Sequence, residues 1–198
     1  MDAQKQEEIL EQITAFADRS HGEQTRKYTP ERYIVHPVRV MRICQEYTND
    51  VAVLAAALLH DVLEDTPVRK EALHGFLKQV MSEADALRTV VLVEELTDVY
   101  IKKRYPKWNR HKRKLKEADR IEKTSGASQT IKYADIIDNC LEIVDQDRDF
   151  AKVFLLECRA LLKRMPKGNK ELYHRAVETV NTCLKKLKQL PRPVQKRD

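Results

Sequence analysis

Residues 51–66 read VAVLAAALLHDVLEDT, and this stretch decides the fold of the chain. Nine apolar or small residues come first, Val51 to Leu59, and the polar pairs His60-Asp61 and Glu64-Asp65 follow them. The run is rich in leucine and alanine, contains no glycine or proline, and follows a capping candidate at Asn49 or Asp50. It therefore predicts a helix rather than a buried strand. A helix that is apolar on every face belongs in the interior of a protein.

The polar end of this helix carries three carboxylates and an imidazole. Residues four apart lie on the same face of a helix, which stacks Glu64 over His60 and Asp65 over Asp61. Many such clusters are salt-bridged or solvated helix ends, but charges retained inside a protein are paired or bound to metal. At the end of an all-apolar helix we therefore favour a metal site.

The composition indicates an all-α protein. Of the 198 residues, 42% are hydrophobic and 34% are charged, and only 4 glycines and 7 prolines leave little turn chemistry for strands. The length suits one domain. We expect a single helical bundle of about eight or more helices over residues 1–190, followed by a basic, mobile tail at residues 191–198.

Several features favour a cytoplasmic protein. The first residues, MDAQKQEE, are polar and acidic, unlike a signal peptide, and no stretch approaches the length of a transmembrane helix. The four cysteines are scattered, which is typical of reduced thiols; they are Cys44, Cys140, Cys158 and Cys183. The formal charge of +6 favours an anionic partner, and a nucleotide, a nucleic acid and plain solubility all remain open as its explanation.

Helical periodicity and capping residues predict the remaining elements. Helices are expected at about residues 4–18, 38–47, 68–80, 82–96, 127–144, 147–165 and 170–190. Between them, residues 102–116 are strongly basic. For this basic stretch we rank a solvated helix face first, a surface that closes over a phosphate-rich substrate second, and a nucleic-acid surface last.

Two further segments carry candidate site residues. In the loop at residues 20–37, Pro37 is expected to start the next helix with His36 as its cap, which fixes the direction of that imidazole. Asp135 faces inward from a strongly apolar helix, so it needs a cation or a donor partner. Lys132 is one candidate for an ordinary salt bridge to Asp135.

The inward-facing polar residues form a mixed nitrogen and oxygen ligand set: His36, His60, Asp61 and Asp135. This set suits Mn²⁺ or Fe²⁺, with Zn²⁺ or Ni²⁺ as further candidates, and leaves coordination positions for water. A metal lowers the pKa of its bound water and neutralises charge on a phosphate oxygen. Glu64 or Asp65 could then orient or deprotonate that water.

The order of these residues, H…HD…D, resembles the HD superfamily of metal-dependent phosphohydrolases. Five finer motifs resemble the hydrolase domain of RelA/SpoT-type proteins and the single-domain ppGpp hydrolases. They are HxxQxRK at residues 21–27, YIxHP at 33–37, AALLHDxxEDT at 56–66, ELTD at 95–98 and KxADxxxN at 132–139. The resemblance covers about residues 9–180.

The resemblance implies a set of roles and a reaction. His36, His60, Asp61 and Asp135 would hold one Mn²⁺, and Glu64 and Asp65 would handle the attacking water. For the substrate, Arg26 and Lys27 would contact the nucleotide and Asn139 would face its sugar. The implied reaction removes the 3′-pyrophosphate of ppGpp and gives GDP and pyrophosphate.

Two departures from the family pattern bear on the substrate. The segment at residues 28–32 is one residue longer than its usual counterpart, and Glu142 stands where the family tends to have threonine. An added carboxylate near a phosphorylated ligand is unfavourable. The motifs and the resemblance together favour, as the first hypothesis, a metal-dependent nucleotide phosphohydrolase with ppGpp as the leading substrate. The alternatives are an HD phosphohydrolase of another nucleotide or phosphorylated small molecule, and a non-catalytic module that binds a nucleotide or nucleic acid.

Overall fold

The computed structural model describes residues 2–189, and over these residues the chain forms ten helices and no strand. The helices are α1 (Ala3–His21), α2 (Val35–Gln45), α3 (Val51–Leu59), α4 (Val62–Asp65), α5 (Lys70–Val80), α6 (Glu83–Leu96), α7 (Arg110–Ile121), α8 (Gly126–Gln146), α9 (Arg148–Leu162) and α10 (Lys170–Gln189). The prediction of an all-α bundle is confirmed. The tail expected at residues 191–198 lies outside the described residues.

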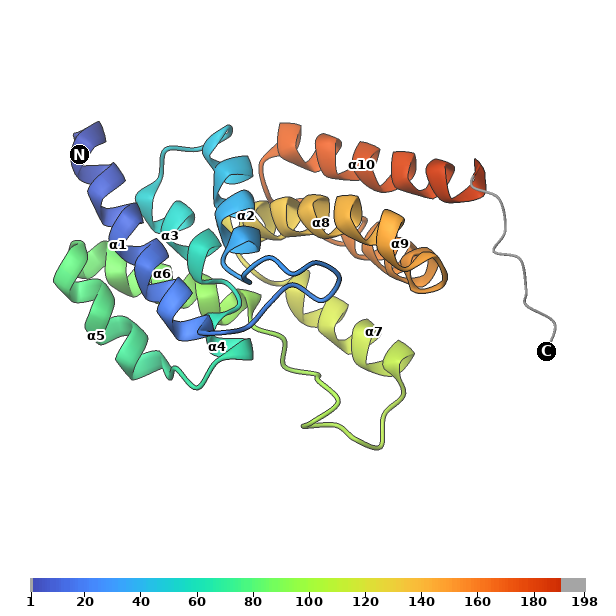
Figure 1. The fold of residues 1–198 in the computed structure, drawn as a ribbon, viewed down its shortest axis with the longest axis horizontal. Coiled ribbons are helices and arrows are strands. Elements are labelled where there is room, and N and C mark those ends of the chain that lie inside the picture. The colour runs from blue at the N-terminus through green and yellow to red at the C-terminus, as the bar shows by residue number, and fades with distance from the viewer. Residues whose placement is uncertain (1, 190–198) are drawn as a thin grey trace.

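Helix α3 lies at the centre of the molecule because every one of its nine residues is buried. It packs against α1, α2, α6 and α8 (Figure 1). Asp50 caps its first turn, since the Asp50 side chain accepts a hydrogen bond from the amide of Ala52. The apolar run thus forms the predicted interior helix.

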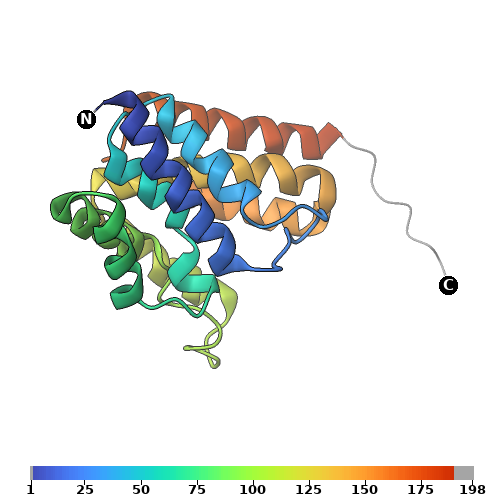
Figure 2. The same ribbon diagram turned by 60° about the vertical axis from the view of Figure 1, so that its left-hand side comes forward.

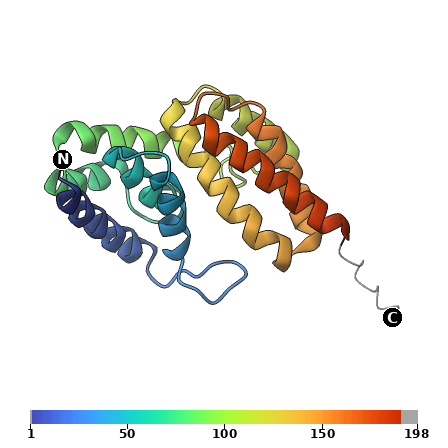
Figure 3. The same cartoon turned by 90° about the horizontal axis from the view of Figure 1, so that it is seen from above.

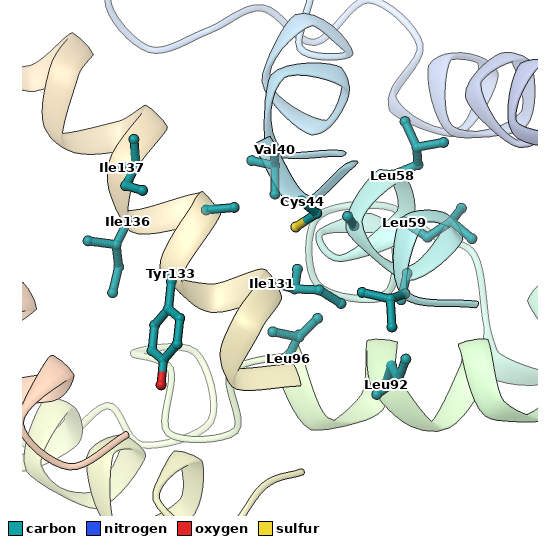
Figure 4. Packing of buried hydrophobic residues seen from close by; sticks show 14 of the residues in the cluster. Val40, Cys44, Leu58, Leu59, Leu92, Leu96, Ile131, Tyr133, Ile136 and Ile137 are labelled. Carbon is teal, nitrogen blue, oxygen red and sulfur yellow. The ribbon is translucent and has the colours of Figure 1, made fainter. Parts of the chain in front are cut away.

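The other helices form two groups on either side of α2 and α3. Helices α1, α5 and α6 lie on one side, and α8, α9 and α10 pack together on the other (Figures 1 and 3). Figure 4 shows where the groups meet: Cys44 of α2, Leu96 of α6 and Ile131 of α8 approach one another in the core. Helix α8 also packs against α2, α3 and α6, so it links its own group to the central helices and to the other group.

Two of the helix boundaries that differ from the prediction matter for the site. The stretch at residues 51–66 is not one helix: α3 ends at Leu59, and the short α4 begins at Val62. His60 and Asp61 form the junction. Helix α2 begins at Val35, so His36 lies inside its first turn rather than capping it.

The turn between α9 and α10 is closed by a buried tyrosine on α8. Tyr133 donates a hydrogen bond to the carbonyl of Met165, and its hydroxyl accepts one from the amide of Gly168 at 3.2 Å. A β-carbon added at Gly168 would lie 2.4 Å from the ring atom Cε2 of Tyr133. Glycine is therefore required for this close approach.

No helix among residues 2–189 is both long enough and apolar enough to span a membrane.

Candidate metal centre

Three elements far apart in the sequence bring two imidazoles and a carboxylate together. His36 comes from the first turn of α2, His60 from the end of α3 and Asp135 from the middle of α8. All three are buried, and one ligand atom from each lies within 4.8 Å of the others. The arrangement can hold a metal ion.

The imidazole of His60 is held in the orientation that a metal ligand requires. Its Nδ1 atom lies 2.8 Å from the carbonyl oxygen of Ala57, one turn earlier in α3. That contact places the ring hydrogen on Nδ1, because a carbonyl only accepts hydrogen bonds. The other nitrogen, Nε2, is buried, lies 3.0 Å from Oδ2 of Asp61 and forms no well-aligned hydrogen bond within residues 2–189. In the neutral imidazole this nitrogen carries the lone pair that a bound cation would take up.

His36 is oriented by a carboxylate. Its Nδ1 atom lies 2.7 Å from Oδ2 of Asp138, which is on α8 beside Asp135. Its Nε2 atom then faces the centre, 3.2 Å from Oδ1 of Asp135. Metal-binding histidines commonly place their second nitrogen against a carboxylate or carbonyl, which fixes the tautomer and raises ligand basicity.

Asp61 lies at the edge of the same cluster. Its Oδ2 atom is 3.0 Å from Nε2 of His60 and 3.7 Å from Nε2 of His36. The hydroxyl of Tyr33 donates to this oxygen at 2.7 Å and lies 3.3 Å from Oδ2 of Asp65. Tyr33 therefore fixes the position of Asp61 relative to Asp65.

The charges at the centre shift each other's pKa values strongly. Burial lowers the pKa of His60, but the negative charges of the nearby Asp61 and Asp135 carboxylates outweigh it and raise the pKa to about 10. Burial likewise opposes protonation of His36, and hydrogen bonds to Asp135 and Asp138 raise its pKa above the usual value. In the metal-free protein, the positive charges of the protonated imidazoles thus offset the negative charges of the carboxylates.

Asp135 has further partners on its own helix. Nζ of Lys132 lies 2.8 Å from its Oδ2 atom, which confirms the predicted pair, and Nδ2 of Asn139 donates to its Oδ1 atom at 2.6 Å. Burial raises the pKa of Asp135, but the charge of Lys132 and the adjacent imidazoles of His36 and His60 hold it well below its usual range. Asp135 is therefore an ionised carboxylate, as a metal ligand must be.

Glu64 and Asp65 lie next to the cluster in α4. The backbone amide of Asp98 donates to Oε2 of Glu64 at 2.9 Å. Although Glu64 as a residue is exposed, its carboxylate lies against the wall of a cavity. Desolvation there raises its pKa to about 7, and the charge of Asp98 contributes. A carboxylate with this pKa can exchange protons near neutral pH.

A cavity of about 360 Å³ opens beside the centre. The candidate residues that line it are His36, Asp61, Glu64, Asp135 and Asn139. The first helical residues of the basic stretch also reach it, since His111 and Lys114 of α7 belong to its wall. The stretch at residues 102–116 therefore includes both cavity-facing and outward-facing cations.

A second cavity of about 290 Å³ adjoins the first, and both are lined by Tyr33, Asn139 and Phe154. Arg26, Lys27 and Glu142 lie in its wall. The loop between α1 and α2 reaches across to α8 to place these cations there (Figure 2). Lys27 donates to the hydroxyl of Tyr28 at 2.7 Å, whereas Arg26 is paired with Glu142 at 2.9 Å.

Three features of the site were not identified from the sequence. They are the contact of Asp138 with His36, the contact of Tyr33 with Asp61, and the ion pair of Arg26 with Glu142. Tyr33 lies within a quoted motif, but nothing in a single sequence shows which oxygen its hydroxyl meets. Asp138 lies three residues after Asp135, and that spacing places both on one face of α8. The spacing was therefore the available signal for Asp138.

The donor set fits a divalent transition metal. Two imidazole nitrogens with carboxylate oxygens suit Mn²⁺, Fe²⁺ or Zn²⁺. Both imidazoles have their second nitrogen engaged, and the unsatisfied Nε2 atom of His60 points at the carboxylates. The residues therefore fit a metal, and the geometry does not identify which one.

Comparison with known proteins agrees with this geometry. The family model described as HD domain matches residues 14–125, which include His36, His60 and Asp61. The enzyme named guanosine-3′,5′-bis(diphosphate) 3′-pyrophosphohydrolase MESH1 is 34% identical in Xenopus tropicalis, over 68% of this chain and 69% of that protein. MESH1 of Homo sapiens is 35% identical over 65% of each chain.

Longer relatives match over a short segment. A guanosine-3′,5′-bis(diphosphate) 3′-pyrophosphohydrolase of Vibrio cholerae is 45% identical over 76 residues, which are 38% of this chain and 11% of that protein. This chain thus spans about a tenth of the length of these longer curated relatives.

A solved structure has the same fold. It is described as a metazoan ortholog of SpoT that hydrolyzes ppGpp and plays a role in starvation responses. The TM-score is 0.73 at 24% identity, and the match covers 92% of this chain and 97% of the other. The family model and the MESH1 sequences establish the family: this chain belongs to the HD domain family, as its ordered histidine and aspartate motifs predict.

Proposed function

We propose that this protein is a Mn²⁺-dependent hydrolase that removes the 3′-pyrophosphate of ppGpp and gives GDP and pyrophosphate. The observation that carries the proposal is the convergence of His36, His60 and Asp135 on one point beside a cavity of about 360 Å³. The names of the MESH1 relatives support the choice of substrate.

In this proposal His36, His60, Asp61 and Asp135 hold the metal. Asp61 is included because its Oδ2 atom faces the Nε2 atoms of both histidines. Mn²⁺ in such a site lowers the pKa of a bound water and neutralises charge on a phosphate oxygen. Asp138 and Tyr33 keep the ligands in place through His36 and Asp61.

Glu64 is the proposed proton acceptor for the attacking water. Its carboxylate lines the cavity and has a pKa of about 7. The water oxygen bonds to the phosphorus that is attached to the 3′-oxygen. The bond between this phosphorus and the 3′-oxygen then breaks, and the 3′-oxygen gains a proton. Asp65, held by Tyr33 beside Asp61, orients the water.

The substrate would extend from the metal into the two adjoining cavities. Asn139 lies at their shared wall and faces the sugar, and Lys27 contacts the nucleotide from the second cavity. Arg26 lies at the same place, but its guanidinium is already paired with Glu142. Lys114 also lines the first cavity, where its ammonium pairs with Asp98 at 3.1 Å.

The pairing of Arg26 with Glu142 favours a second candidate within the same class. An arginine that is held by a carboxylate offers less positive charge to a phosphate. The alternative is thus an HD phosphohydrolase of a less charged nucleotide or another phosphorylated small molecule.

We further propose that residues 1–190 act as one catalytic domain in the cytoplasm, with no membrane partner. The absence of a membrane-spanning helix among residues 2–189 is consistent with this proposal.

Turnover of a nucleotide panel with Mn²⁺ tests the function, with pyrophosphate and orthophosphate measured separately and His60→Ala as the control. The expected result is pyrophosphate from ppGpp that is lost in the variant. Release of orthophosphate from another nucleotide would exclude ppGpp as the substrate and support the second candidate function. If the metal-loaded protein turned over no nucleotide, the assignment as an enzyme would be contradicted and a binding module would be favoured.

A further inference from the structure

Arg26 and Glu142 form a largely buried ion pair that joins the loop after α1 to the last turns of α8. Nε and Nη2 of Arg26 both donate to Oε2 of Glu142, at 3.0 and 2.9 Å. The two side chains keep only 8% and 12% of their accessible surface. Buried pairs of this kind are screened little by solvent, so the two charges compensate each other strongly.

The pair is linked to the metal centre by one residue. Nη2 of Arg26 also donates to Oδ1 of Asn139 at 3.0 Å, and Nδ2 of Asn139 donates to Asp135. Glu142 thus holds Arg26 in a fixed position against the same helix that supplies Asp135. A change at Glu142 would act on the substrate through the guanidinium of Arg26.

The second cavity around the pair has aromatic walls and a low net charge. Tyr28, Phe150 and Phe154 supply rings, and the ionisable side chains in its wall besides Tyr28 and Tyr33 are Arg26, Lys27 and Glu142. The ammonium of Lys27 lies 4.6 Å from the ring centroid of Tyr28 and 5.1 Å from that of Phe150. Rings beside a compensated ion pair suit an uncharged aromatic group better than a phosphate.

We propose that Glu142 is a specificity-determining residue, which neutralises Arg26 and so makes the second cavity select an uncharged ring, such as a nucleobase, over a phosphate group. The inference rests on the proposed nucleotide substrate. It also explains how an added carboxylate is compatible with a phosphorylated ligand, because the guanidinium of Arg26 balances it. Glu142 is a positioning residue in this account, since it acts through Arg26.

Equilibrium binding of GMP, GDP and GTP to the Mn²⁺-loaded protein tests the proposal by calorimetry. These ligands carry no 3′-phosphate, and they differ in negative charge on one nucleoside. In Glu142→Gln the charge of Arg26 is no longer compensated, while a side chain of the same size remains to hold it. The ratio of GTP affinity to GMP affinity should rise about tenfold over the wild type, which corresponds to about 1.4 kcal/mol.

Two variants separate charge compensation from a merely structural role. Arg26→Gln combined with Glu142→Gln removes both charges, so its affinity ratio should return to the wild-type value. Asp145→Asn removes one carboxylate from the same helix, where Asp145 pairs with Lys186 instead, and should leave the ratio within twofold. Wild-type Mn²⁺ affinity in each variant would show that the fold and the centre are intact.

Equal ratios in the wild type and Glu142→Gln would overturn the proposal, as would an equal rise in Asp145→Asn. If Glu142→Gln does not fold, the double variant and Arg26→Gln alone remain informative. Arg26→Gln should lower the ratio below the wild-type value, and an unchanged ratio there would also overturn the proposal. Because these measurements need no turnover, they are independent of whether ppGpp is hydrolysed.

Discussion

At the scale of single residues, the candidate centre depends on which nitrogen of each imidazole is occupied. His60 gives its Nδ1 hydrogen to the carbonyl of Ala57, and His36 faces Asp138 through Nδ1. Both Nε2 atoms are therefore directed at the carboxylates of Asp61 and Asp135. In the proposed centre these residues hold the metal, and a second group, Glu64 and Asp65, acts on the water.

Glu64 belongs to the second group, so Glu64→Gln should leave Mn²⁺ affinity unchanged within about twofold and lower kcat by about 10²–10⁴. The loss follows from removing the proton acceptor while an amide of the same size keeps its contact with the amide of Asp98. Calorimetry and steady-state kinetics on one preparation measure the two quantities. A loss of metal binding in this variant would instead make Glu64 a ligand.

Asp138 orients His36, so Asp138→Asn should weaken Mn²⁺ binding by about 10–100-fold, the usual effect of losing such a partner. An amide in place of the carboxylate removes the negative charge that raises the basicity of the ring. Asp145→Asn is the matched control, because it removes the same charge from the same helix away from the centre. Equal Mn²⁺ affinity in the two variants would exclude this role for Asp138.

Metal binding should release protons, because the pKa of His60 is raised to about 10 and that of His36 lies above its usual value in the metal-free protein. Imidazoles must lose a proton to bind a metal, so Mn²⁺ affinity should rise with pH up to about pH 10, the raised pKa of His60, and fall at lower pH. Calorimetry in buffers with different ionisation enthalpies measures the protons released. A binding enthalpy that is the same in every buffer would contradict the expectation.

Sequence reasoning reached the residues that carry chemistry but not all of their contacts. Residue type and inward direction on an apolar helix were sufficient to select His60 and Asp135. The contact of His36 with Asp138 joins residues 102 positions apart, and only the packing of α2 on α8 creates it. Glu142 was predicted to be unfavourable near a phosphorylated ligand because its partner, Arg26, lies 116 positions earlier, and the sequence does not show that the two residues meet.

At the scale of helices, the break between α3 and α4 shapes the centre. Asp61 at the junction has φ −98° and ψ −8°, and the chain turns there before α4 begins. The composition predicted a helix throughout residues 51–66, because no glycine or proline marks the break. Tertiary contacts of the polar side chains, such as that of Asp61 with Tyr33, decide the local geometry instead.

Helical periodicity also overestimated burial on the outer helices. Apolar residues recur at helical spacing along both α6 and α9, yet four of them are exposed: Leu87, Val91, Val153 and Leu156. Their neighbours on α6 and α9, such as Val90 and Leu155, are buried as expected. A periodic pattern gives the direction of a helix face but not how far a neighbouring helix covers it.

The close approach of the α9–α10 turn to α8 gives a prediction about stability. Gly168→Ala should destabilise the protein by about 1–3 kcal/mol, because the added carbon would lie 2.4 Å from the ring of Tyr133. Gly75→Ala is the control: it lies inside α5 with no atom within 4 Å of an added carbon, so it should stabilise by about 0.4–1 kcal/mol. Urea unfolding measures both, and a stable Gly168→Ala protein would show that the turn can move.

At the scale of the whole molecule, the centre lies where the central helices meet the group formed by α8, α9 and α10. Helix α3 is central, α2 lies beside it, and α8 packs against both. Ligands from these three helices meet at one point, so a metal ion would bind the folded chain and not the unfolded one. Fold class and the ordered site motifs were predictable because each follows from local pattern. The two cavities were not, because they arise between elements distant in the sequence.

The central claim is that one metal ion at His36, His60, Asp61 and Asp135 enables the removal of pyrophosphate from ppGpp. The most direct test is to strip the protein with a chelator and follow pyrophosphate release from ppGpp as Mn²⁺ is added back, with His60→Ala alongside. The account predicts no release without metal, a rise that ends at one equivalent of Mn²⁺, and no rise in the variant. Full pyrophosphate release by the stripped protein, or by His60→Ala, would contradict it.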